Sequence, residues 1–145
     1  MARSINVFSP DADRAERLKE VLQALYEANK QIPIVVEGRR DAAALRRLGL
    51  TGIIITLHSG KAIYDFCEDI AGRYDRIILL MDWDENGDRL FGMLVKNLRG
   101  HCEEFSSFRE IIKVLCQKDI RDIEGIPDLL EKLTGTRVIL SDVTL

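Results

Sequence analysis

Two apolar runs in this chain of 145 residues each end abruptly in acidic residues. Residues 77–81 are all Ile, Leu or Met, and Asp82 and Asp84 follow at once. Residues 32–36 form a second run, which leads into Glu37. A short apolar run bounded by turn residues is typical of a buried parallel strand, and ligands bind beyond the carboxyl ends of such strands in open α/β sheets. The pattern therefore predicts a parallel sheet with carboxylates at one rim.

The remaining residues alternate between helical and strand patterns. Apolar residues at helical spacing predict an amphipathic N-terminal helix over 11–28 and a C-terminal helical region over 104–134. By length the chain is one domain, 1–145, with room for a real core. Strands are expected at 32–36, 52–57 and 77–81, and any fourth strand would be short and lie near 103–105; helices are expected from 42 to a stop at Gly49 and over 63–74, 89–98, 108–115 and 126–133. Right-handed crossovers would place the ends of the first three strands on one rim.

The acidic motif after the second run has two competing interpretations. Its D-x-D-x-N-G start is shared with EF-hand calcium loops, but the twelfth residue is Met93 where an EF-hand needs a bidentate Glu. A phosphatase of the haloacid-dehalogenase type also places D-x-D after a buried strand, with the first Asp, here Asp82, as nucleophile. That family expects Thr or Val where this chain has Asn86. The phosphatase is kept as an alternative.

Together the two motifs resemble the Toprim domain of topoisomerases, bacterial-type primases and several nucleases. They read V-V-E-G-R-R-D over 35–41 and L-M-D-W-D-E-N-G-D-R over 80–89. The resemblance covers about residues 32–100 and is closest to small, free-standing Toprim proteins related to the ribonucleases that mature 5S ribosomal RNA. It implies a single compact Toprim-like α/β domain, with a small, mainly parallel sheet flanked by helices.

The resemblance also implies a metal site. Glu37, Asp82 and Asp84 would hold Mg²⁺, with Mn²⁺ as a substitute, because carboxylate oxygens suit a hard cation that also binds substrate phosphate. Glu37 would act as general acid or base. Asp88 fills the place where an acid commonly follows the glycine of the motif, and its side chain is one methylene shorter than the usual Glu.

Basic residues beside these acids are candidate phosphate ligands. Arg39 and Arg40 follow the first motif and Arg89 ends the second, and the planar guanidinium suits phosphate. Ser59 and Lys61 lie in a Ser-Gly-Lys fragment at the same level, which lacks the full spacing of a phosphate loop, so helix capping is the other duty open to Ser59. The net charge of −3 argues against nucleic-acid binding, but bound metal would offset the clustered acids.

The leading functional hypothesis is a Mg²⁺-dependent nuclease acting on structured RNA, with RNA favoured over DNA. A noncatalytic module that binds metal and nucleic acid is the main alternative, and a protein partner or a homo-oligomer is left open. With no apolar run long enough to span a bilayer and no signal peptide, a cytoplasmic protein is expected, without membrane association. Cys67, Cys102 and Cys116 share no C-x-x-C spacing and are expected to be buried thiols.

Overall fold

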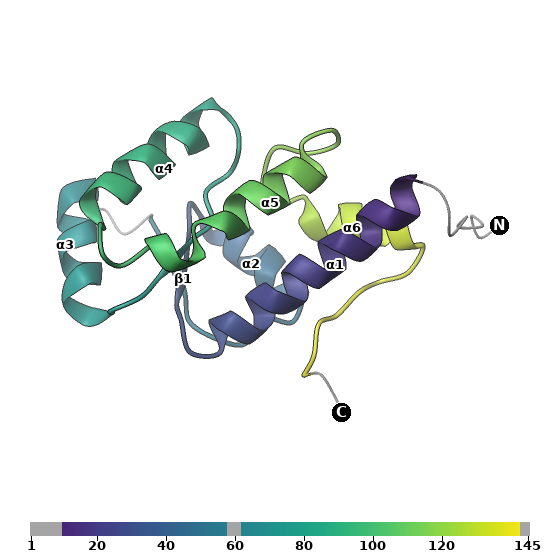
Figure 1. Ribbon diagram of the computed structural model, residues 1–145, viewed down its shortest axis with the longest axis horizontal. Coiled ribbons are helices and arrows are strands. Elements are labelled where there is room, and N and C mark those ends of the chain that lie inside the picture. The colour runs from purple at the N-terminus through teal and green to yellow at the C-terminus, as the bar shows by residue number, and fades with distance from the viewer. Residues whose placement is uncertain (1–9, 58–61, 143–145) are drawn as a thin grey trace.

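A parallel sheet lies between two groups of helices in the computed structural model, which describes residues 10–57 and 62–142 (Figure 1). Within these residues the sheet has three strands in the order β2-β1-β3, with β1 at Ile34–Val36, β2 at Ile54–Thr56 and β3 at Ile78–Leu79. Both neighbours of β1 run parallel to it. The carboxyl ends of all three strands therefore lie on one rim, and the expected α/β class is confirmed.

The central strand β1 is buried on both faces. Ile34 and Val36 belong to one apolar cluster, and Val35 belongs to another on the opposite face. All three side chains are fully buried. This two-sided burial explains why the run in the sequence is continuously apolar and does not alternate with polar residues.

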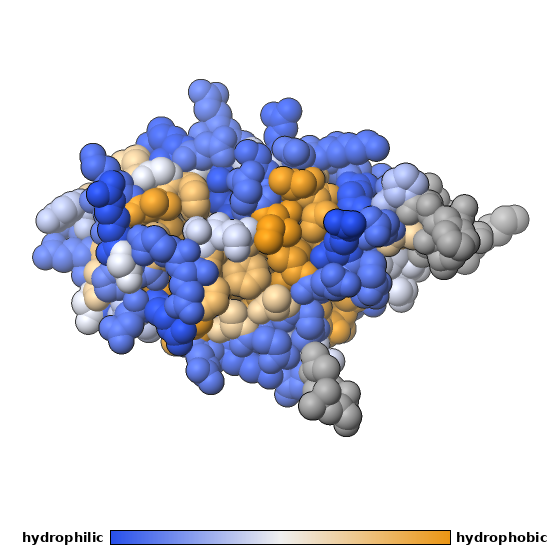
Figure 2. All heavy atoms as spheres, viewed as in Figure 1, coloured by the Kyte–Doolittle hydropathy of each residue, from blue (hydrophilic) through white to orange (hydrophobic). Residues whose placement is uncertain are grey.

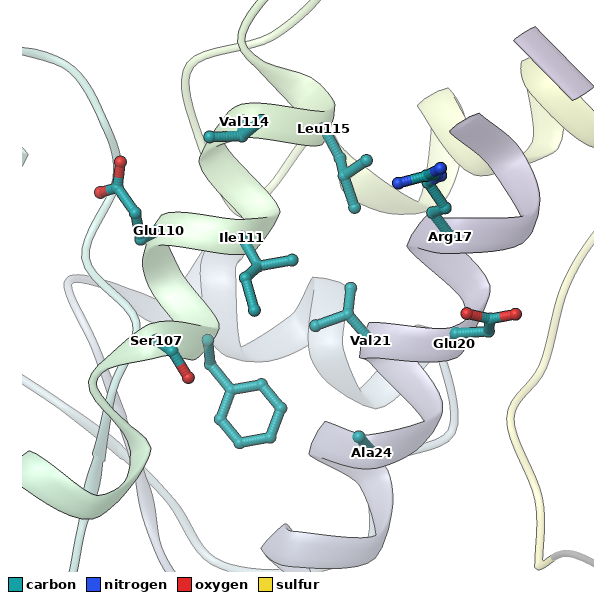
Figure 3. Close-up of a pocket in the computed structure, with 10 residues that line it drawn as sticks. Arg17, Glu20, Val21, Ala24, Ser107, Glu110, Ile111, Val114 and Leu115 are labelled. Carbon is teal, nitrogen blue, oxygen red and sulfur yellow. The ribbon is translucent and has the colours of Figure 1, made fainter. Parts of the chain in front are cut away.

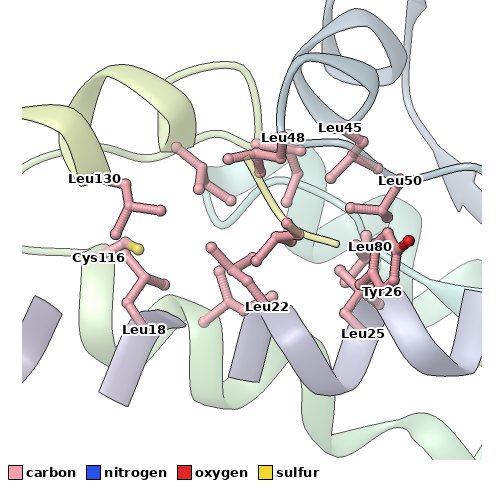
Figure 4. Close-up of a cluster of buried hydrophobic side chains, with 14 of the residues drawn as sticks. Leu18, Leu22, Leu25, Tyr26, Leu45, Leu48, Leu50, Leu80, Cys116 and Leu130 are labelled. Atoms are coloured by element: carbon pink, nitrogen blue, oxygen red, sulfur yellow. The ribbon is translucent and has the colours of Figure 1, made fainter. Parts of the chain in front are cut away.

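Helices from distant parts of the chain cover the two faces. The first cluster contains Leu18 and Leu22 of the N-terminal helix together with Leu45 and Leu130 (Figure 4). The helices of this face are α1 (Pro10–Asn29), α2 (Arg39–Arg47), α5 (Ser107–Cys116) and α6 (Ile126–Thr134); those of the other face are α3 (Ile63–Arg73) and α4 (Glu85–Asn97). The expected helices are all present, with ends shifted by a few residues.

One element and one helix boundary differ from expectation, each for a physical reason. The fourth strand expected at 103–105 was wrong, because Glu103–Phe105 is a 3₁₀ turn (η1). The carboxylate of Glu103 accepts hydrogen bonds from the amide of Gly100 at 3.0 and 2.9 Å, which curls the chain before it can extend along the sheet. Helix α4 begins at Glu85, four residues before the expected Arg89, because Asp84 caps it.

The three cysteines are free and buried, as expected. Among the described residues, no helix is both long and apolar enough to cross a membrane.

An apolar groove of about 570 Å³ lies between α1 and α5. Val21 of α1 and Ile111 of α5 point toward one another across it (Figure 3). Figure 2 shows apolar side chains gathered over these two helices on the same face, and Ile111 and Val114 are among the exposed large apolar residues. The two helices therefore leave part of their apolar surface uncovered.

Candidate metal centre and nucleic-acid interface

The acids of the two motifs meet at the rim of the sheet. Glu37 directly follows β1, and Asp82 follows the apolar run that contains β3. The Oε2 atom of Glu37 accepts a hydrogen bond of 2.7 Å from the amide of Asp82, and its Oε1 lies 3.4 Å from the side-chain nitrogen of Asn86. Residues separated by 45 positions in the sequence are thus joined by a direct contact.

Asp82 lies in an environment that disfavours its negative charge. The pKa of Asp82 is raised to about 8, mainly by partial burial and in part by the charges of Asp41 and Glu37. The amide of Ile123, which donates to Oδ1 at 2.9 Å, opposes this shift. A cation at the rim would favour the ionised carboxylate, because opposite charge stabilises the charged form.

Asp84 serves as the N-cap of α4. Its Oδ1 accepts a hydrogen bond of 2.6 Å from the amide of Gly87, one of the amides that a helix N-terminus leaves unpaired. A Cβ atom at Gly87 would stand only 2.0 Å from the carbonyl oxygen of Asp82. The glycine of the motif is therefore required by a close approach of two backbone segments.

Asp41 accepts a capping hydrogen bond at the first motif, as Asp84 does at the second. Its Oδ2 accepts a hydrogen bond of 3.1 Å from the amide of Gly38, at the start of α2. Burial raises the pKa of Asp41, and nearby acids, with Glu37 first among them, add to the shift. Asp41 was not among the predicted site residues, although a carboxylate three residues into a helix is a known capping position.

Arg109 of α5 supports the second motif, and no sequence pattern predicted this role. Its Nε donates to the carbonyl oxygen of Met81 at 3.0 Å, and its Nη2 donates to the carbonyl oxygen of Asp82 at 2.5 Å and to Oδ1 of Asp88 at 2.6 Å. The guanidinium also lies over the ring of Phe91, 4.5 Å from its centre. Asp88 is thus engaged by an arginine in the structure.

The segment of residues 120–123 is joined to the same motif by three hydrogen bonds. The indole Nε1 of Trp83 donates to the carbonyl oxygen of Ile120 at 2.7 Å, and the backbone amide of Trp83 donates to that of Arg121 at 3.0 Å. In return, the amide of Ile123 donates to Asp82. Trp83, which occupies a variable position of the motif, therefore attaches the C-terminal region to the site.

The candidate phosphate ligands are partly placed. Arg39 and Arg40 are exposed at the start of α2, directly after Glu37. Arg89 is exposed on the first turns of α4, where it donates to Oδ1 of Asn86 at 2.8 Å. Ser59 and Lys61 lie outside the described residues.

The donor set fits a hard cation, but the side chains are not fully gathered around one point. Glu37 and Asp82 are adjacent and supply the oxygens that Mg²⁺ prefers. No three His, Cys, Asp or Glu side chains within residues 10–57 and 62–142 are grouped closely enough to hold an ion as they stand. Asp84 is the next acid along the motif after Asp82. Its Oδ1 accepts a hydrogen bond from the amide of Gly87 in α4.

Comparison with known proteins finds similarity over most of the chain. Residues 32–114 match the Toprim domain. A UPF0292 protein of Methanosarcina barkeri is 32% identical over 126 residues, covering 83% of this chain and 85% of the relative. A UPF0292 protein of Pyrococcus horikoshii is 36% identical over 115 residues, covering 79% and 84%. A solved structure of a protein from Aquifex aeolicus superposes with a TM-score of 0.61 at 30% identity, covering 74% of this chain and 95% of that one.

Proposed function

Because this chain belongs to the Toprim family, we propose that it performs Mg²⁺-dependent phosphodiester chemistry on nucleic acid, with hydrolysis of structured RNA as the leading activity. Membership of the family points to a metal-dependent function connected with nucleic acid. The observation that carries the proposal is the contact between Glu37 and Asp82 at the rim, since it brings the two acidic motifs together.

In this proposal the acids have two roles, which are metal binding and proton transfer. Glu37 and Asp82 would hold the cation, with Asp84, the N-cap of α4, as a third carboxylate beside them. When bound, Mg²⁺ would polarise the phosphoryl group and stabilise charge on the leaving oxygen. Glu37 moves a proton at its carboxylate, which is within hydrogen-bonding distance of the Asp82 amide and faces the same rim. Asp88 contributes mainly through Arg109, which it holds at 2.6 Å.

The arginines supply the affinity for the substrate. Arg39 and Arg40 are exposed, and within the described chain neither forms a hydrogen bond or an ion pair, so both guanidinium groups are free to meet phosphates. Their position next to Glu37 would hold the phosphodiester against the acids. RNA is favoured over DNA on the resemblance to small Toprim ribonucleases.

One observation favours the noncatalytic alternative. The three acids of the motifs do not converge closely in the described structure, as a module that binds nucleic acid without turnover would allow. The phosphatase alternative gains no comparable support.

The test separates cleavage from binding. Wild-type protein should cleave a panel of structured RNAs in Mg²⁺ and not in EDTA, and Glu37→Gln should abolish cleavage while retaining affinity, because it removes the proton-transfer group and keeps the shape. Replacing Arg39 and Arg40 by Ala should weaken binding and flatten its salt dependence. Binding without cleavage by the wild type, across RNA and DNA and with Mg²⁺ and Mn²⁺, would establish the noncatalytic module. Labelling of Asp82 by a small phosphoester would establish the phosphatase.

A further inference from the structure

A second cavity lies beside the acidic motif, on the side of α4. It has a volume of about 770 Å³ and is lined by Asp84, Glu85, Asn86, Arg89 and Arg121. Arg89 and Arg121 come from parts of the chain 32 positions apart, and only Arg89 belongs to the region that carries the family resemblance in the sequence. Two guanidinium groups therefore face one open space next to Asp84.

Neither arginine is neutralised by an ion pair within the described chain. Arg89 donates to the amide oxygen of Asn86 and lies 3.5 Å from the sulfur of Met93. The side chain of Arg121 is exposed and has no hydrogen-bond partner or ion pair among residues 10–57 and 62–142. The cavity has room for an external anion, and its two arginines have no ion-pair partner among the described residues to compete with that anion.

The backbone holds Arg121 at a fixed place relative to the acids. The carbonyl oxygen of Arg121 accepts from the amide of Trp83 at 3.0 Å, and that of Ile120 accepts from its indole at 2.7 Å. The amide of Ile123 donates to Asp82 at 2.9 Å. The position of Arg121 is therefore set by the same residues that form the acidic motif, and its side chain takes no part in that connection.

We propose that Arg121, together with Arg89, binds a backbone phosphate of the nucleic acid next to the phosphate that meets the acids. The inference rests on the proposed function and adds to it a phosphate-binding residue from outside the region matched to the Toprim domain. The planar guanidinium can make two parallel hydrogen bonds to a phosphate, and a pair of them offsets the negative charges of Asp84 and Glu85 in the same cavity.

The test compares Arg121 with a matched arginine far from the rim. Arg99 is exposed, has no ion pair within the described chain, and follows the C-terminal end of α4, which is about 20 Å from the capping end at Asp84. The affinity of Arg121→Ala, Arg121→Lys and Arg99→Ala for a fluorescein-labelled RNA hairpin is measured by anisotropy over a range of salt concentrations in Mg²⁺. Inorganic phosphate serves as competitor, and thermal unfolding confirms that each variant is folded.

Arg121→Ala should bind about tenfold more weakly than the wild type, the effect of one charge-assisted contact. Its plot of log affinity against log salt should lose roughly 0.7 to 0.9 of slope. Arg121→Lys should keep the slope and recover part of the affinity, whereas Arg99→Ala should match the wild type.

The failures of the two proposals give different results. If the wild type cleaves the hairpin and binds it through Arg39 and Arg40 but Arg121→Ala behaves like Arg99→Ala, the inference on Arg121 is wrong and the proposed function stands. If inorganic phosphate binds through Arg121 without displacing RNA, the cavity takes small anions and the inference is also wrong. If the wild type binds neither RNA nor DNA, both proposals fail.

Discussion

Replacing Arg109 by Met should destabilise the protein strongly, although Arg109 lies outside both sequence motifs. The substitution keeps the length of the side chain and removes every donor. Arg109 is buried, and its donors reach two carbonyl oxygens at 3.0 and 2.5 Å and a carboxylate at 2.6 Å. Loss of the charged donor leaves the carbonyl oxygens of Met81 and Asp82 without this partner at the end of the sheet.

The expected magnitude follows from these contacts. A hydrogen bond from a charged donor contributes roughly 1.5 to 3 kcal/mol, so the two bonds to carbonyl oxygens contribute about 3 kcal/mol at the lower end of that range. The ion pair adds under about 1 kcal/mol, because the side chain of Asp88 is 54% exposed. Removing the guanidinium also removes its desolvation cost, which offsets the ion pair. The net loss is therefore about 3 kcal/mol, or a fall of about 10 °C in Tm for a chain of this length.

Urea unfolding measures this loss directly. Trp83 is the single tryptophan and lies in the motif that Arg109 supports, so its fluorescence reports on this region, and far-UV circular dichroism reports on the helices. Asp88→Asn is the control and should cost less than about 1 kcal/mol, because an exposed amide oxygen can still accept from Arg109. A loss below about 1 kcal/mol for Arg109→Met, with an unchanged m-value, would refute the reasoning.

Two further changes test the geometry of the acidic motif. Gly87→Ala places a methyl group 2.0 Å from the carbonyl oxygen of Asp82, so it should cost at least about 2 kcal/mol in urea unfolding and reduce the rise in Tm on adding Mg²⁺. Gly92→Ala on the same helix has open space and should be neutral or stabilising by up to about 1 kcal/mol; equal effects of the two substitutions would contradict the close approach. The second change concerns pH: the folded-state pKa of Asp82 is raised to about 8 from 3.8, so its contribution to stability is present below about pH 4 and is lost as the pH rises toward 8. Measured in EDTA, the Tm of the wild type relative to Asp82→Asn should therefore fall between pH 5 and 8, and Mg²⁺ should reduce that fall; a difference that stays constant with pH would show that Asp82 titrates normally.

The strands and the two acids at the rim were accessible from the sequence because their signals are local. A continuous apolar run reports burial on both faces of a strand, and Glu37 and Asp82 directly follow such runs. Parallel topology then places both at one rim. Gly49 was also accessible as a helix stop, and its φ of +105° is a conformation that favours glycine.

The supporting residues were not accessible because their contacts are distant in sequence. Arg109 meets Asp82 across 27 positions, and Ile123 meets it across 41. Backbone donors and acceptors are present whatever the residue type. The residue types at 120–123 therefore do not predict hydrogen bonds to the acidic motif. The strand expected at 103–105 failed for a related reason, since the hydrogen bond from Gly100 to Glu103 is a local competitor that a strand pattern does not register.

The attachment of residues 120–123 to the acidic motif also bears on where this fold can be cut. The Toprim match ends at residue 114, within α5, while the residues that bond to Trp83 and Asp82 begin six positions later. A protein shortened to the matched region would keep both acidic motifs. It would still lose Ile123, whose amide donates to the carboxylate of Asp82. It would also lose both α1 and α6, whose leucines belong to the same apolar cluster. The region matched to the Toprim domain and the folded unit therefore have different ends in this chain, and domain transplants should carry residues 10 through at least 134.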